Sequence, residues 1–389
     1  MKRKINVCFI SGGYPACHDG IGDYVAKLIS SLDRESLEVS LITSNEGPII
    51  KYIERNNISG VFPIIKKWNM FAIIVILKLI KKEKFDIIHL QFPSSKYKKT
   101  FFLCFLPFLL RVVLKKNTVT TLHEFSISYP ISKLRQIFLS LGSHRVVVTD
   151  NIDTRNLVKT MVISKRKIKF IPIGSNIDVC GIDPGEKEAF LERSGFDKQA
   201  KTIVFFGFIH YNKGLECLLK SVDKAVAEGT NIQLLIISQL YSKDNAYHNK
   251  IEKMIGSLSM CKSVFVTGYA APREVSKFLS LSDLCVLPFT DGVTLRRGTL
   301  MAALTHKKAI ISTVLKEYVP AQLVDKKNII LIPVNDVEKL AEAIKILCVD
   351  DGLRKKISET AGQLSEKFSW PKIAQMHKKL YLEMINNLQ

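Results

Sequence analysis

Residues 284–313, LCVLPFTDGVTLRRGTLMAALTHKKAIIST, contain the pattern that decides the fold. The apolar run 284–287 has the length and composition of a buried strand. A polar loop follows at 291–298, and the sequence then predicts a helix over 299–306 and a second buried strand over 309–312. Two buried strands joined through a helix indicate a βαβ unit of a parallel sheet.

The loop between this strand and helix is suited to an anion. The first amides of a helix lack intrahelical partners, and the dipole is positive at that end. Gly292 and Gly298 allow close approach of the backbone, and Arg296 and Arg297 add forked donors that match phosphate. The two arginines are either phosphate ligands or solvated surface charges. We favour phosphate, because they lie between two glycines at the carboxyl end of a strand.

Composition and charge point to an anionic partner. The chain has 389 residues, enough for two domains with full cores, and combines 47% hydrophobic residues with a formal charge of +21. This combination predicts contact with a membrane surface or a nucleic acid. The segment 66–116 holds only two acidic residues, Glu83 and Asp86. Its twelve basic residues are Lys66, Lys67, Lys78, Lys81, Lys82, Lys84, Lys96, Lys98, Lys99, Arg111, Lys115 and Lys116.

Cysteines and apolar segments set the expected compartment. The eight cysteines are scattered without a C-x-x-C pair, so neither a zinc site nor a disulfide framework is indicated, and we expect a reducing cytoplasm. The first apolar run ends at Ser11, too early for an export signal. The run 101–110 is limited by Pro107 and Arg111, and a bilayer span needs about 20 apolar residues, so we expect no transmembrane helix.

Strands and helices alternate along nearly the whole chain, which predicts an α/β protein with parallel sheets covered on both faces. In the first half the predicted strands are 5–10, 39–43, 61–64, 86–89, 118–121, 145–149 and 168–171, with helices at 20–32, 69–82, 97–114, 131–141 and 151–161. A linker is predicted over 176–197. The second half has predicted strands at 202–206, 233–237, 264–267, 284–287, 309–312 and 329–332, and final helices near 337–347, 353–367 and 370–387.

Two helices of the first half are apolar nearly all round. The segments 71–80 and 101–114 are both flanked by lysines. They are either core helices with charged ends or helices that lie in the interface of an anionic membrane with lysines at the level of the headgroups. We favour the membrane interpretation, because apolar surface and positive charge coincide.

Glycines follow the first strand. Gly12 and Gly13 are separated by an insertion from Gly20 and Gly22, so they do not form the G-x-G-x-x-G dinucleotide fingerprint, and a dehydrogenase is disfavoured. They suit a loop that closes over a ligand, or they are simple turn glycines. His123 directly follows a strand, at the edge where open α/β sheets bind ligands.

Together these residues resemble the family 4 glycosyltransferases. The resemblance covers nearly the whole chain, and its strength lies in the order and spacing of its motifs. The motifs are Gly12-Gly13 with Gly20-Ile21-Gly22; the D-x-x-H strand from Asp86 to His89; His123-Glu124; the I-P-x-G-x-x-x-D joint at 171–178; Gly207 with Lys213-Gly214; Thr267-Gly268; 291–299; and Phe368-Ser369-Trp370.

The resemblance implies a GT-B fold: two Rossmann-like parallel-sheet domains facing across a cleft, with a C-terminal helix crossing back to the first domain. We expect an acceptor-side domain at 1–178, a donor-side domain at 179–367 and a crossover helix at 368–389. The implied activity is a retaining glycosyltransferase that moves a sugar from a nucleoside-diphosphate sugar. The acceptor we expect is a lipid-linked or cell-surface glycan precursor, at the cytoplasmic face of the plasma membrane.

The resemblance also implies the site residues. The expected catalytic residues are His123, Lys213, Asp291 and Arg297, with His123 contacting the transferred sugar. The expected donor-binding residues are Gly207, Lys213, Gly268, Tyr269, Asp291, Gly292, Val293, Thr294, Leu295, Arg296, Arg297 and Thr299. The loop with Gly12, Gly13, Gly20, Ile21 and Gly22 is expected near the diphosphate or the acceptor.

The chain departs from the family pattern at two places. The family commonly carries two glutamates seven residues apart, of which the second holds the ribose; here Asp291 and Thr299 occupy these positions. Phe208 stands where the family has an arginine after the glycine. The loop instead resembles a subgroup with G-V-S/T-x-R-R-G, and we infer that Arg296 or Arg297 supplies the missing charge beside Lys213.

A mechanism follows from charge. Breaking the sugar–diphosphate bond develops negative charge on the leaving group, which Lys213, the arginines and the amides of 292–295 would stabilise. No cofactor or divalent metal is then expected, since no D-x-D element is evident. Retaining glycosidases use two carboxylates, whereas only Asp291 lies on the donor side, so we favour attack from the face of the departing diphosphate.

Two other functions remain as alternatives. A nucleotide-sugar 2-epimerase shares the architecture but needs no acceptor. A nucleic-acid-binding protein is suggested only by net charge, and no helix-turn-helix, zinc finger or aromatic–basic RNA motif is recognisable.

Overall fold

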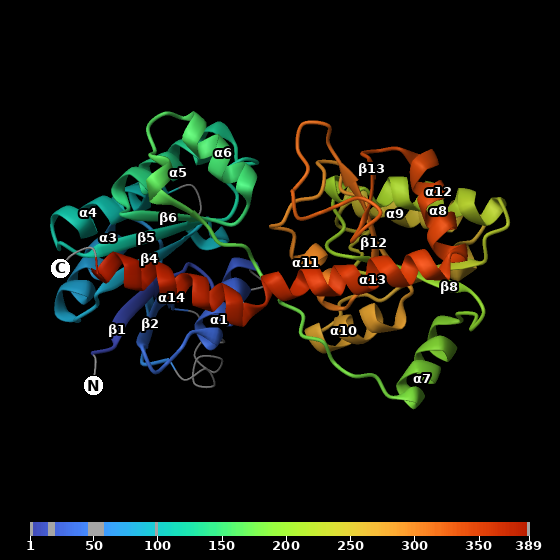
Figure 1. The fold of residues 1–389 in the computed structure, drawn as a ribbon, viewed down its shortest axis with the longest axis horizontal. Helices are drawn as coiled ribbons and strands as arrows, with labels where there is room; N and C mark the ends of the chain where they lie inside the picture. Colours follow the sequence, from blue (N-terminus) through green and yellow to red (C-terminus); the bar gives the residue numbers. More distant parts are fainter. Residues whose placement is uncertain (1–2, 15–19, 46–57, 98–99, 387–389) are drawn as a thin grey trace. The chain divides into compact units, whose positions relative to one another are not determined.

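The computed structural model describes residues 3–14, 20–45, 58–97 and 100–386. Cys17, Lys98, Lys99 and the expected last residue of the final helix, 387, lie outside the described residues. The chain divides into two compact units (Figure 1). Unit 1 comprises Met1–Gly174 with Ser369–Gln389, and unit 2 comprises Ser175–Phe368.

Unit 1 is built on a seven-stranded sheet in which every neighbouring pair is parallel. The spatial order is β3-β2-β1-β4-β5-β6-β7. The strands are β1 Ile5–Ile10, β2 Leu37–Ser44, β3 Gly60–Ile65, β4 Ile87–Phe92, β5 Asn117–Leu122, β6 Arg145–Val148 and β7 Ile168–Phe170. All seven predicted strands are confirmed, because near-continuous apolar runs are characteristic of parallel strands buried on both faces.

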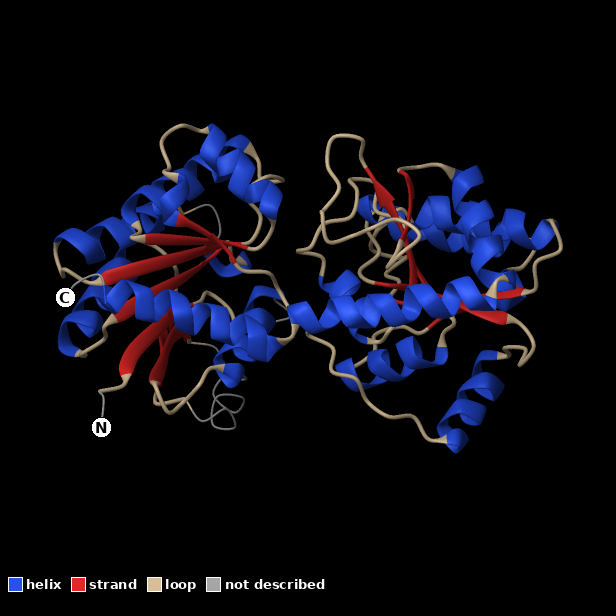
Figure 2. Ribbon diagram, in the orientation of Figure 1, coloured by secondary structure: helices blue, strands red, loops and turns tan. Residues whose placement is uncertain are grey.

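Helices cover both faces of this sheet (Figure 2). One face packs against α1 Gly20–Ser31 and α14 Trp370–Asn386, which also contact each other. The other packs against α3 Met70–Lys82, α4 Leu106–Val112, α5 Pro130–Gly142 and α6 Asn151–Lys159. The C-terminal helix therefore belongs to unit 1, although it follows unit 2 in the chain.

Unit 2 repeats the architecture with a six-stranded parallel sheet in the order β10-β9-β8-β11-β12-β13. The strands are β8 Lys201–Phe206, β9 Ile232–Ile237, β10 Val264–Val266, β11 Leu284–Leu287, β12 Ala309–Val314 and β13 Ile330–Pro333. The helices are α8 Leu215–Ala227, α9 Ala246–Ser257, α10 Pro272–Leu281, α11 Gly298–Thr305, α12 Val337–Val349 and α13 Asp351–Ser365. The βαβ unit predicted from 284–313 is confirmed as β11, α11 and β12.

Two predictions of secondary structure are wrong. The segment 97–114 is not one helix: a 3₁₀ turn at Phe102–Phe105 precedes α4, because Pro107 lacks an N–H and is tolerated only in the first turn of an α-helix. The linker predicted over 176–197 contains a helix, α7 Pro184–Ser194. A capping box between Asp183 and Glu186 starts α7, and a left-handed Gly195 ends it.

No helix among the described residues combines the length and apolar character that a membrane crossing requires.

Candidate functional site

The carboxyl edge of the unit 2 sheet brings several predicted site residues together. Strand β8 leads into Gly207 and Lys213, and β11 leads into the loop 288–297. The two segments touch, since the amide of Thr290 donates to the carbonyl oxygen of Asn212 over 3.1 Å. The edge where parallel strands end is where open α/β sheets bind their ligands.

Gly214 fixes the backbone beside Lys213. It adopts a left-handed conformation with φ 68°, and a β-carbon here would lie 1.8 Å from the carbonyl oxygen of Pro288. No other residue fits this contact without displacing the backbone. The position of Lys213 against the β11 loop therefore depends on glycine at 214.

Two cations share one aromatic ring at this edge. The Lys213 Nζ lies 5.3 Å from the ring centroid of the buried Phe289, and the Arg297 Cζ lies 4.4 Å from it. Arg297 also forms an ion pair with Asp291. Burial, followed by repulsion from Arg297, lowers the pKa of Lys213 to about 8. The two like charges lie near each other in a partly desolvated place, which favours binding of a counter-anion.

The amides of the loop are not equally available to an anion. Gly292 donates its N–H to Phe289 at 3.3 Å, and Val293 donates to Thr313 at 2.8 Å, so both amides are engaged within the protein. Gly292 has φ 76°, and the side chains of Val293, Thr294 and Leu295 are buried. These residues shape the loop, and the first-turn amides of α11 remain as donors to an anion.

Unpartnered polar atoms surround the same place. The Thr299 Oγ1 and the Arg297 Nε are buried without a hydrogen-bond partner among the described residues. A β-carbon at Gly207 would meet the Thr299 Cγ2 at 3.3 Å, so the end of β8 lies close to the start of α11. Buried polar groups are normally satisfied, so these atoms indicate a ligand. Arg296 is half-buried in the same loop.

Gly268 and Tyr269 follow β10, two strands away from β8 in the sheet. Gly268 has φ 75°, and the amide of Tyr269 donates to the Gln239 Oε1 at 2.7 Å. The ring of Tyr269 is 66% exposed. Gln239 was not predicted from the sequence, because a single glutamine after a strand belongs to no motif. An exposed aromatic ring beside a fixed backbone is suited to stacking with a planar group.

The carboxyl edge of the unit 1 sheet carries His123. The His123 side chain is only 7% exposed, and its Nε2 lies 3.1 Å from the Oε1 of the fully buried Gln91 on β4. The ring of Tyr24 meets it edge-on, with centroids 4.8 Å apart. Burial lowers the pKa of His123 to about 3, so the ring is neutral. Gln91 and Tyr24 were missed by sequence reasoning; the polar residues at alternate positions of β4 were the only signal.

A buried polar network lies beside His123. His89 hydrogen-bonds to the Tyr381 hydroxyl through Nδ1 and to the Thr121 hydroxyl through Nε2, both at 2.7 Å. The Tyr24 hydroxyl lies 3.0 Å from the His377 Nε2. Burial lowers the pKa of His89 well below its usual value and that of His377 to about 3. His89 of the D-x-x-H strand thus joins α14 to the sheet.

Two glycines of the first loop, Gly12 and Gly22, lie in crowded places, whereas a β-carbon on Gly20 would meet nothing within 4 Å. A β-carbon on Gly12 would lie 2.4 Å from the Ser94 Oγ, and one on Gly22 would lie 3.1 Å from the backbone of Gly13. Gly20 and Ile21 form the first turn of α1. Residues 15–19, which complete the predicted loop, lie outside the described part of the chain.

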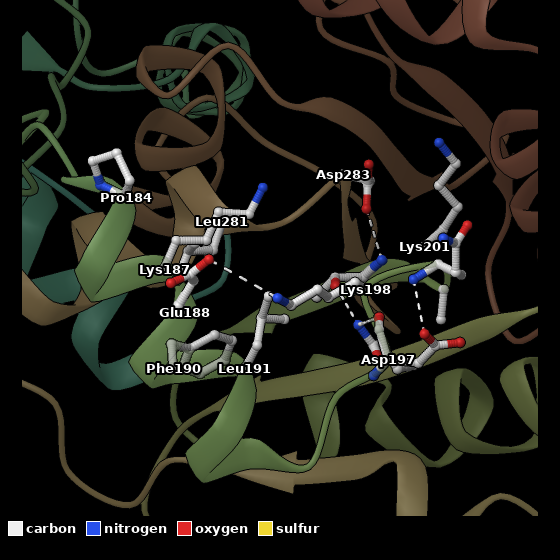
Figure 3. A pocket seen from close by; sticks show the side chains of 14 residues that line it. Pro184, Lys187, Glu188, Phe190, Leu191, Asp197, Lys198, Lys201, Leu281 and Asp283 are labelled. Carbon is white, nitrogen blue, oxygen red and sulfur yellow. Dashed lines mark hydrogen bonds and ion pairs between the residues drawn. The ribbon is translucent and has the colours of Figure 1, made fainter.

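A cavity of about 380 Å³ lies at the opposite edge of the unit 2 sheet (Figure 3). It is lined by α7 and by residues at the amino ends of strands, including Lys201 and Asp283. Its charges are largely matched: Lys198 faces Glu188 at 4.0 Å, and Asp283 accepts the amide of Thr202 at 2.7 Å. We assign no site here, because these charges are matched, whereas Lys213, Arg297 and the unpartnered Thr299 Oγ1 lie at the other edge.

Within the described residues, no group of three or more His, Cys, Asp or Glu side chains is arranged to hold a metal ion.

The sequence matches two family models. Residues 18–179 match Glycosyltransferase Family 4, and residues 200–350 match Glycosyl transferases group 1. A UDP-Gal:alpha-D-GlcNAc-diphosphoundecaprenol alpha-1,3-galactosyltransferase of Escherichia coli is 21% identical over 381 residues, which cover 92% of each chain. The chain spans only 20% to 57% of the length of three other curated relatives that it matches.

Solved structures show the same fold at low identity. A glycosyltransferase from Rickettsia africae has a TM-score of 0.80 and 18% identity, with 99% of this chain and all of that chain covered. Anabaena HepE in complex with UDP and glucose has a TM-score of 0.76 and 13% identity, with 97% of this chain and all of that chain covered. A UDP-N-acetylglucosamine 2-epimerase has a TM-score of 0.58 and 15% identity over 94% of each chain.

The structure has two parallel α/β units, and the C-terminal helix belongs to the first. Each half of the chain also matches a glycosyltransferase family model. The chain is a glycosyltransferase with the GT-B fold, and it belongs to glycosyltransferase family 4.

Proposed function

We propose that this glycosyltransferase is a retaining enzyme that takes a sugar from a nucleoside-diphosphate sugar, with the diphosphate bound at the carboxyl edge of the unit 2 sheet. The observation that carries the proposal is the pair Lys213 and Arg297 on the ring of Phe289, beside the first turn of α11. A diphosphate matches two fixed cations and a helix N-terminus. The structure of Anabaena HepE in complex with UDP supports nucleotide binding by a protein of this fold.

Charge development determines the mechanism that we propose. The bond between the anomeric carbon and the diphosphate oxygen breaks, and the negative charge moves to the diphosphate. Lys213, Arg297 and the α11 amides stabilise that charge, and such preorganised donors are usually the largest catalytic contribution. The acceptor oxygen bonds to the same face of the anomeric carbon, and its proton passes to the departing diphosphate, so the configuration is retained.

Asp291 has a supporting role in this scheme. Its carboxylate is ion-paired with Arg297, so it orients the guanidinium and is not free to act as a nucleophile. No divalent metal is required in our proposal, because fixed side-chain cations neutralise the leaving group. Thr299 places a hydroxyl where the family commonly has a carboxylate, and we propose that this unpartnered Oγ1 binds the donor.

His123 has a different role in the proposal. A ring that is neutral throughout the physiological pH range offers hydrogen bonds without charge. We propose that it binds a hydroxyl group of the transferred sugar. It is therefore a sugar ligand and not an acid catalyst.

The acceptor that we propose is a lipid-linked glycan precursor of a cell-surface polysaccharide, at the cytoplasmic face of the plasma membrane. Two features support this: the named diphosphoundecaprenol acceptor of the Escherichia coli relative, and the net charge of +21, which suits an anionic surface. A nucleotide-sugar 2-epimerase is the alternative, since one such enzyme shares the fold.

The test combines the purified chain with a panel of nucleotide sugars, with and without a lipid extract of undecaprenyl-linked saccharides, and identifies the products by mass spectrometry. We expect extension of a lipid-linked acceptor and release of nucleoside diphosphate. Epimerised nucleotide sugar without acceptor would support the alternative. The Lys213→Gln variant should turn over about 10²–10³-fold more slowly, whereas the matched control Lys355→Gln, which changes an exposed lysine on α13, should keep the activity of the unaltered chain.

A further inference from the structure

One surface of unit 1 is apolar where a soluble protein is usually polar. It lies on α3, on the turn Phe102–Phe105, on α4 and on the start of α5, which contact one another in series. We call this surface the α3–α5 face. Its exposed apolar residues are Met70, Phe71, Ile74, Val75, Phe102, Phe105, Phe108, Val112, Val113, Ile131 and Leu134. Phe71 is 66% exposed and Phe108 is 53% exposed.

The inner sides of these helices already supply the core. On α3 the buried residues are Ala72, Ile73, Ile76 and Ile80, and on α4 they are Leu106, Pro107 and Leu110. The core therefore leaves Met70, Phe71, Ile74, Val75, Phe108 and Val112 of these two helices unexplained, since all six are exposed. Single exposed apolar side chains are ordinary, but eleven of them on adjoining elements indicate an interaction site.

Positive charge borders the patch. On α3, the exposed positions continue from Phe71 and Val75 to Lys78 and Lys82, so one side of the helix is apolar in its first two turns and basic in its last. The exposed basic residues around the face are Lys66, Lys67, Lys78, Lys81, Lys82, Lys84, Arg111 and Lys115. None of these eight forms an ion pair with another described residue, whereas Lys224 and Lys250 of unit 2 are paired with glutamates.

We propose that the α3–α5 face docks on an anionic phospholipid bilayer, with its aromatic and aliphatic side chains below the phosphates and its lysines among them. Apolar side chains ringed by lysine are the composition of interfacial helices. A second copy of the chain is disfavoured as the occupant, because an isologous contact would bring the unpaired cations of two copies together. The proposal names the surface at which the transfer proposed above would occur, but its test requires no turnover.

The test is sedimentation of the full-length chain with sucrose-loaded vesicles. One set is phosphatidylcholine alone, and the other contains one quarter phosphatidylglycerol. We expect binding to the anionic vesicles that weakens as salt rises, because about 1 kcal/mol per lysine near the surface is screened by salt. A residual bound fraction should persist at 0.5 M salt, since apolar insertion is not screened. That residual fraction separates insertion from purely electrostatic adsorption.

Substitutions on the α3–α5 face test whether this surface is the part of the chain that contacts the bilayer. Phe71→Ser with Phe108→Ser should weaken binding to anionic vesicles roughly a hundredfold, about tenfold for each aromatic group withdrawn from the bilayer. Lys81→Gln with Lys82→Gln should weaken it about tenfold or more at low salt and little at high salt. The matched control is Val349→Ser, which removes an apolar side chain that is 81% exposed in unit 2 and should bind as the unaltered chain does. Circular dichroism melts verify that each variant is folded.

Three outcomes would overturn the proposal. They are no binding to anionic vesicles at low salt, equal binding by the double phenylalanine variant, and a dimer in sedimentation velocity that the same variant dissociates. Nucleoside-diphosphate binding is measured on the same samples. A chain that binds nucleotide but not vesicles refutes the lipid face alone, and a chain that binds vesicles but no nucleotide refutes the proposed transfer alone.

Discussion

The two units use the same sheet architecture for opposite chemistry at their carboxyl edges. In unit 2 the edge carries Lys213 and Arg297, two cations on one buried ring. In unit 1 the edge and the network beside it carry His89, His123 and His377, whose pKa values are all lowered by burial. One edge thus presents positive charge, and the other presents uncharged hydrogen-bonding groups. In unit 2 the difference comes from loop residues, whereas in unit 1 it comes also from His89 and Gln91 within β4 and Thr121 within β5.

The largest effect is expected at the cationic edge. Lys213→Gln removes a charge that stabilises the leaving group, so kcat should fall by about 10²–10³, the cost of one lost electrostatic donor. Steady-state kinetics with the identified donor measures it. An unchanged kcat would show that the edge of unit 2 does not hold the reacting diphosphate.

The next effect concerns the backbone that positions Lys213. Gly214→Ala introduces a β-carbon 1.8 Å from the Pro288 oxygen at a left-handed φ, and should lower the free energy of unfolding by about 2–4 kcal/mol. Gly256→Ala is the matched control, because its β-carbon meets nothing within 4 Å, and it should stabilise α9 by about 0.5–1 kcal/mol. Urea melts compare the two. Equal stability of both variants would contradict the close contact.

A fall in pH should destabilise unit 1, because its buried histidines are neutral in the folded protein. The lowered pKa values mean that the unfolded chain binds more protons below about pH 6.5, so stability is present above that pH and is lost as the pH falls. Each histidine contributes a slope of up to about 1.4 kcal/mol per pH unit. His377→Gln removes up to one proton from the difference in proton binding between the unfolded and folded chain. The slope of the unfolding free energy against pH, measured by urea melts between pH 5 and 7, should therefore fall by up to about 1.4 kcal/mol per pH unit. An undiminished slope would show that His377 is protonated in the folded protein.

The smallest effect is a pH dependence of nucleotide affinity. Lys213, with a pKa of about 8, is protonated below that pH, so nucleoside-diphosphate affinity should be flat there. Above it, binding must take up a proton, and affinity should fall by at most about tenfold per pH unit. Calorimetry at pH 8.5 in buffers of different ionisation enthalpy measures the uptake. Release of protons on binding would contradict the assignment of Lys213 to the diphosphate site.

The fold could be predicted from the sequence almost throughout, whereas many contacts around the candidate site residues could not. Apolar runs such as 284–287 identify parallel strands because both faces of the sheet are buried. Helix α7 was missed because its capping residues resemble a linker and its apolar pattern is weak. Gln91 and Gln239 were missed because neither belongs to a motif, and only the fold brings them to His123 and Tyr269. The Gly292 amide is engaged by a local turn that begins at Phe289, whereas the engagement of the Val293 amide depends on Thr313 of β12, a contact that no local pattern encodes.

The most direct measurement is calorimetric titration of the folded chain with a panel of nucleoside diphosphates. We expect at least one to bind with a defined heat, and Lys213→Gln and Arg297→Gln each to weaken its affinity by about tenfold or more, the loss of one charge-assisted contact. Absence of binding for every member of the panel, or equal affinity in both variants, would contradict the assignment of the diphosphate to the edge of unit 2.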